Sequence, residues 1–74
     1  MNHSEQTHAQ LVARIPEATG RGLGEWMATL DAGPGLLRFD ERVNWLRSEH
    51  DLPHSFASAI VHEHALARAA RRSS

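Results

Sequence analysis

Histidine and carboxylate side chains are concentrated in the second half of the chain, around one short polar segment and along the stretch that follows it. Imidazole and carboxylate groups bind transition metals, and an adjacent Glu–His pair can transfer protons in acid–base catalysis. Both groups also serve structurally, as hydrogen-bonding residues at helix ends. The candidate contacts for a protein partner or a ligand are Glu49, His50, His54, His62 and Glu63.

The spacing of the histidines limits the chemistry that they can perform. Side chains two residues apart on a helix point about 200° apart, so His62 and His64 cannot bind one ion together. The His-Glu-x-x-His pattern of helical metalloproteases is absent, and His50 and His54 flank a turn. The glycines at 20, 22 and 24 lack the strand and the lysine of a phosphate-binding loop. We therefore predict no metal, no cofactor and no catalytic residue, and favour a non-enzymatic function.

Residues 43–62 also fit a helix-turn-helix, the arrangement in which a second helix reads the major groove of DNA. The segment that would read DNA, residues 54–61, has no Arg, Asn or Gln to contact base edges. Only Arg68, Arg71 and Arg72 are placed to meet phosphates, and the whole chain carries a net charge of −1. Nucleic-acid binding through these three arginines is therefore the alternative function.

Apolar residues recur at helical spacing along the whole chain, which predicts an all-α fold. A proline has no backbone N–H to donate, so the first helix should end or kink just before Pro16. The bounds of the four expected helices follow from caps, glycines and prolines: Ser4 to just before Pro16, 23–32, 39–49, and Pro53 or His54 to Arg71. Three to four short helices then form one compact domain over residues 1–74, with a helix-turn-helix-like hairpin at about 39–71.

The same spacing predicts which side chains form the core. The inward-facing residues are Leu11, Val12, Ile15, Leu23, Trp26, Met27, Leu30, Phe39, Val43, Leu46, Phe56, Ala57, Ile60 and Val61, continued by His64 and Ala67. Trp45, Leu46, Phe56 and Ile60 should pack across the turn between the last two helices. Because a buried indole N–H needs an acceptor, we expect Trp26 and Trp45 at the edge of the core.

Composition bounds the class of protein. The chain has 74 residues and no cysteine, and all eight of its basic residues are arginine. No disulfide can stabilise it, and its net charge of −1 gives no overall attraction to nucleic acid or anionic lipid. It has no apolar stretch of about 20 residues, and its polar first residues do not form a secretory signal. We expect a cytoplasmic protein that does not enter a membrane.

A set of residues spread over most of the chain matches a known sequence pattern. The stretch VNWLRSEHDLPHSFASAIVHE, residues 43–63, follows the pairs Thr19-Gly20 and Glu25-Trp26. Its Trp-Leu, Glu-His, Leu, His and Val-His-Glu elements resemble a family of short bacterial helical domains of unknown function, over about residues 10–64. The resemblance implies a helical fold and no activity. That family usually has glycine where this chain has Asp51 and Pro53, which implies a stiffer turn here.

These observations together favour a small interaction module that binds a protein partner or a second copy of itself as a homodimer. Its small core and its aromatic residues suit burial against another chain. Binding of a metal or a small ligand through the His/Glu cluster is a second alternative, beside nucleic-acid binding. Within the cluster we expect His50 to be a structural residue at the end of its helix, and His54 and His62 to be more exposed.

Overall fold

The computed structural model describes residues 3–36 and 38–73, and within them it forms four α-helices. They are α1 (His3–Thr19), α2 (Leu23–Ala32), α3 (Phe39–His50) and α4 (His54–Ser73). No strand occurs in these two ranges, so the predicted all-α fold is confirmed. None of the helices in this part of the chain is both long and apolar enough to cross a membrane.

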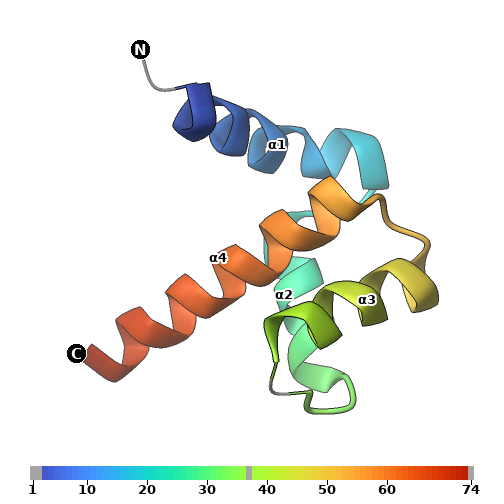
Figure 1. Cartoon of the computed structure of the whole chain (residues 1–74), viewed down its shortest axis with the longest axis vertical. Coiled ribbons are helices and arrows are strands. Elements are labelled where there is room, and N and C mark those ends of the chain that lie inside the picture. Colours follow the sequence, from blue (N-terminus) through green and yellow to red (C-terminus); the bar gives the residue numbers. More distant parts are fainter. Residues whose placement is uncertain (1–2, 37, 74) are drawn as a thin grey trace.

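The longest helix, α4, contacts each of the other three. It runs diagonally across the molecule, with α1 on one side and α3 on the other (Figure 1). Its buried residues are Ala57, Ile60, Val61 and His64, besides Ala59. The first four have the i, i+3, i+4, i+7 spacing of one helix face, and we call them the α4 seam.

The hydrophobic core gathers side chains from all four helices and from the turn between α3 and α4. Its buried members are Ile15, Trp26, Val43, Leu46, Leu52, Ala57, Ile60 and Val61. Burying one aliphatic side chain fully contributes about 1.5–3 kcal/mol, so each of these residues matters in so short a chain. Across the α3–α4 turn, Leu46 and Ile60 are fully buried, whereas Trp45 and Phe56 are partly buried against the core.

Of the two alternatives expected at Pro16, an end or a kink of the first helix, the end is wrong, because α1 continues through Pro16 to Thr19. Proline removes only one helical N–H, and the turn that follows is held by other bonds. The backbone N–H of Gly20 donates to the Pro16 carbonyl oxygen at 2.9 Å. The Thr19 hydroxyl lies 2.6 Å from the Ile15 carbonyl oxygen, to which it donates. Thr19 therefore stays in α1, with its hydroxyl facing the start of α2.

Two expectations about the core are also wrong. Trp26 does not lie at the edge: it is 4% exposed, and its indole Nε1–H donates to the Thr19 hydroxyl oxygen at 3.0 Å. With its one polar atom paired, the tryptophan can be buried. Phe39 has the spacing of a core residue, yet it is 47% exposed. It is the first residue of α3, and the buried residues of that helix, Val43 and Leu46, begin one turn later.

The turn between α3 and α4 depends on one residue in the left-handed conformation. Asp51 caps α3 with φ 55° and ψ 36°, a conformation that Asp tolerates and glycine adopts freely. The reversal directs Leu52, which is 8% exposed, into the core and starts α4 at His54.

Candidate functional site

A cavity of about 550 Å³ lies between the end of α2, the segment that follows it, and the second half of α4. It is lined by Leu30, Asp31, Gly35, Leu36, Arg42, His64, Arg68, Arg71 and Arg72. Four of the chain's eight basic residues line this cavity, which we call the arginine pocket. Within the described residues, Asp31 is the one acidic side chain of its lining. The pocket therefore concentrates positive charge in a chain whose net charge is −1.

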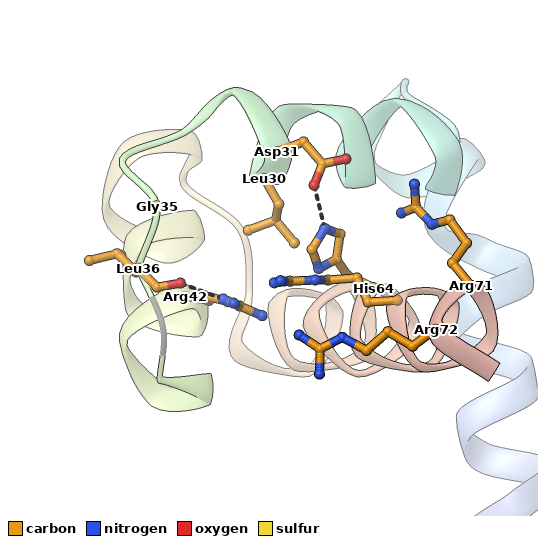
Figure 2. A pocket seen from close by; sticks show the side chains of 9 residues that line it. Leu30, Asp31, Gly35, Leu36, Arg42, His64, Arg71 and Arg72 are labelled. Carbon is orange, nitrogen blue, oxygen red and sulfur yellow. Dashed lines mark hydrogen bonds and ion pairs between the residues drawn. The ribbon is translucent and has the colours of Figure 1, made fainter.

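A histidine–aspartate pair forms one wall of the pocket. His64 is 4% exposed, and its Nε2 lies 2.8 Å from Oδ1 of Asp31, to whose carboxylate it donates (Figure 2). This hydrogen bond holds the pKa of the Asp31 carboxyl below its ordinary value. Partial desolvation of the carboxyl opposes the shift, and the charges of Arg71 and Arg68 add to it. Asp31 is thus ionised beside the arginines.

The second ring nitrogen of His64, Nδ1, is buried and has no hydrogen-bond partner within the described residues. An unpaired buried polar atom costs about 1–3 kcal/mol, a cost that an apolar residue at this position of the α4 seam would avoid. An apolar residue at this position could not form the hydrogen bond by which the buried imidazole holds Asp31 at the pocket wall.

The arginines reach the pocket from two helices. Arg42 of α3 donates from Nε to the Leu36 carbonyl oxygen at 2.7 Å, which fixes the direction of its guanidinium group. On α4, Arg68 and Arg72 follow His64 at i+4 and i+8 and therefore share its face. In Figure 2 the guanidinium groups of Arg42 and Arg72 converge below His64, whereas that of Arg71 lies nearer Asp31. Guanidinium groups so placed can bind carboxylate or phosphate oxygens in pairs.

A different group of polar residues joins α1 to α4. Nε2 of His8 lies 2.8 Å from Oε2 of Glu63, and the His8 and His62 rings meet edge to face with centroids 5.0 Å apart. His62 therefore contacts α1, while His64 contacts α2. The two histidines point away from each other, as their spacing predicts, and they belong to separate groups.

His50 occupies a third location, between two tryptophans. Its ring meets Trp26 at 5.3 Å and Trp45 at 5.2 Å between centroids, edge to face in both cases. The guanidinium group of Arg21 lies 4.4 Å from the centre of the Trp26 ring, on its face. Thr19, Trp26, Trp45 and His50 belong to the sequence pattern described above, and here they are packed together at one end of the core. A structural function for His50 stays a prediction.

The five candidate residues from the sequence are thus distributed over separate places. Glu49 and His54 are exposed, and within residues 3–36 and 38–73 no hydrogen bond or ring contact joins His50 to His54. Glu63 and His62 lie together at α1. Sequence reasoning missed His8, Asp31 and Arg42 and assigned His64 only to the core. The i+4 and i+8 spacing from His64 to Arg68 and Arg72 was a signal for part of the pocket. Nothing in the sequence indicates that one face of α4 meets Asp31 of α2 or that another meets His8 of α1.

The fold and its side chains define a small all-α domain with an arginine-lined pocket. The chain belongs to the family described as domain of unknown function DUF4287, whose model matches residues 7–65. The family has no assigned activity, which agrees with the resemblance found in the sequence. The matched region includes Asp31, Arg42 and His64 and ends before Arg68. Comparison with curated proteins gives no match, and comparison with solved structures gives none either.

Proposed function

We propose that this domain is a protein-interaction module whose arginine pocket holds an anionic side chain of its partner, either a carboxylate or a phosphate group. The observation that carries this proposal is that Arg42, Arg68, Arg71 and Arg72 all line one cavity of about 550 Å³. The planar N–H donors of arginine match pairs of carboxylate or phosphate oxygens. Asp31 opposes only one of these four positive charges, so the pocket favours an anion.

The composition of the lining favours a protein partner over a free small molecule. Small-molecule sites are mostly apolar, with a few polar groups that orient the ligand. Here Leu30 and Leu36 are the large apolar members of a mainly charged lining. Affinity for a partner must then come also from contacts with the protein surface around the pocket. Phe39 is 47% exposed and lies three residues before Arg42 on α3, on the same face of the helix, where it offers an apolar contact.

The arrangement suits a protein partner better than nucleic acid. DNA carries one negative charge per ~1.7 Å of its axis and is bound by basic side chains distributed along a surface. In this chain four of the eight basic side chains line one cavity. The first turns of α4, residues 54–61, carry no Arg, Asn or Gln for base contacts.

A binding titration with a fluorescent peptide tests the proposal. The peptide carries one phosphoserine flanked by glutamates, and its uncharged control has serine flanked by glutamines. We expect saturable binding of the acidic peptide alone, with inorganic phosphate as a competitor. Arg68→Gln and Arg72→Gln should each weaken binding roughly tenfold, because each removes a charge-assisted hydrogen bond. Arg14→Gln, which changes an exposed arginine of α1, is the matched control and should bind like the parent.

Two results would contradict the proposal. If Arg14→Gln weakens binding as much as the pocket variants do, the peptide responds to overall charge and the pocket has no special function. If labelled duplex or single-stranded DNA binds more tightly than the peptide, with an affinity that falls steeply as salt is added, the nucleic-acid alternative replaces the proposal.

A further inference from the structure

His8, His62 and Glu63 form a cluster on the other side of α4 from the arginine pocket. Each residue offers one ligand atom, and the three atoms all lie within 4.8 Å of one another. His8 comes from α1, and the other two are successive residues of α4. From this geometry we propose that the cluster is a binding site for a divalent transition-metal ion, with Zn²⁺ as its representative.

The distances between the ligand atoms are close to those that a zinc ion requires. With metal–ligand bonds of about 2.0–2.1 Å, the ligand atoms of a tetrahedral site lie about 3.3 Å apart. His8 Nε2 and Glu63 Oε2 are already 2.8 Å apart, and the widest separation in the cluster is at most 4.8 Å. The three ligand atoms are therefore close to the spacing of a zinc site before any ion binds.

The ligand types select the class of ion. Two imidazole nitrogens and one carboxylate oxygen suit zinc and its neighbours in the periodic table, whereas Mg²⁺ and Ca²⁺ prefer oxygen ligands throughout. The same set of two histidines and one glutamate occurs in zinc sites that keep a coordination position open for water. His62 is exposed, and the side chains of His8 and Glu63 are 35% and 28% exposed, so an ion and its water can enter from solvent.

The cluster lies where it can connect two diverging helices. Figure 1 shows α1 and α4 separating towards the two ends of the chain. Ile15 packs in the core, and His8 lies two turns before it in α1, towards the N-terminus. In the absence of an ion, the hydrogen bond between His8 and Glu63 bridges the helices there. A bound ion would replace that single bond with three and fix the first half of α1 to the middle of α4.

Isothermal titration calorimetry of the untagged full chain with zinc chloride tests the site. We expect one ion per chain with a Kd on the order of micromolar. Zinc at about 100 times that Kd should raise the melting temperature by about 10–20 °C. His8→Ala and His62→Ala should each weaken binding by at least about tenfold. His54→Ala, which removes an exposed histidine outside the cluster, should bind zinc like the parent.

His62→Ala should leave the fold intact, because His62 is exposed and its replacement removes no core contact. Unchanged helical circular dichroism in His62→Ala would show that lost binding reflects a lost ligand. The proposal is overturned if the parent shows no saturable zinc binding up to about 1 mM. It is equally overturned if His54→Ala weakens binding as much as His62→Ala does. Neither outcome affects the arginine pocket, which contains none of these residues.

Discussion

His62 and His64 lie two residues apart on the same helix but in opposite chemical surroundings. His62 is exposed, and its partners are His8 and Glu63, which supply a second imidazole and a carboxylate. His64 is 4% exposed, and it holds Asp31 at the wall of a pocket lined by four arginines. One side of α4 is therefore suited to a cation and the other to an anion.

This difference does not come from α4 alone. A helix turns about 100° per residue, so two positions place the histidines about 200° apart, on opposite sides of α4. The chemistry of each is then set by the helix that packs on its side: α1 brings His8 to one face, and α2 brings Asp31 to the other. A histidine in a helical sequence is therefore best interpreted by asking which neighbouring element its face meets.

The largest expected effect is a difference in the free energy of unfolding between the variants His64→Ala and His62→Ala. His64→Ala empties the space of a buried side chain and breaks its hydrogen bond to a carboxylate. These two losses together exceed what is regained by removing the unpaired Nδ1, and the free energy of unfolding should fall by about 1.5–3 kcal/mol. For a chain of this length, each kcal/mol lowers the melting temperature by about 4–8 °C. His62→Ala is the matched control and should change the free energy of unfolding by no more than about 0.5 kcal/mol without metal. Equal melting temperatures for the two variants would show that the contrast between the faces is wrong.

A smaller effect concerns the pH dependence of the anion-binding side. Because the hydrogen bond from His64 lowers the pKa of Asp31 in the folded chain, the carboxylate contributes stability above its ordinary value of 3.8. That contribution is lost as pH falls through the folded-state pKa. The difference in urea midpoint between the parent and Asp31→Asn should therefore narrow from neutral pH to about pH 3. The effect is modest, because the Asp31 side chain is 59% exposed.

Glu17→Gln serves as the control for that comparison, since it removes one negative charge from an exposed position of α1 outside the pocket. Subtracting its effect leaves the part that belongs to the His64–Asp31 pair. If the corrected difference between Asp31→Asn and the parent stays constant over the whole pH range, the hydrogen bond does not favour the ionised carboxylate.

Much of the fold could be predicted from the sequence, because helix ends and helix faces are local properties. The glycines and prolines at 20–24, 33–35 and 51–53 separate the helices, and the apolar spacing identified Ile60, Val61 and even His64 as inward-facing. The exceptions were also local in origin. The helix continues through Pro16 because hydrogen bonds hold the turn that follows it. Phe39 has the spacing of a core residue, but it lies before the buried part of its helix.

The two sites could not be predicted, because each depends on residues distant in the sequence. His8 and Glu63 are 55 positions apart, and Asp31 and His64 are 33 apart. No local pattern specifies which face of α4 meets α1 and which meets α2. The sequence grouped His50 with His54 because they flank one turn, whereas the tryptophans of α2 and α3 surround the His50 ring.

The most direct test of the two-sided helix is a pair of NMR titrations on separate samples of the same labelled chain, one with zinc and one with inorganic phosphate. The account predicts that zinc shifts or broadens the ring resonances of His8 and His62 and leaves the arginine Nε–H signals in place. Phosphate should shift the Nε–H signals of Arg42 and Arg72 and leave the His8 and His62 rings unchanged. If either ligand perturbs both sets, or if neither ligand perturbs its own set, the two faces of α4 do not hold separate sites of opposite charge preference.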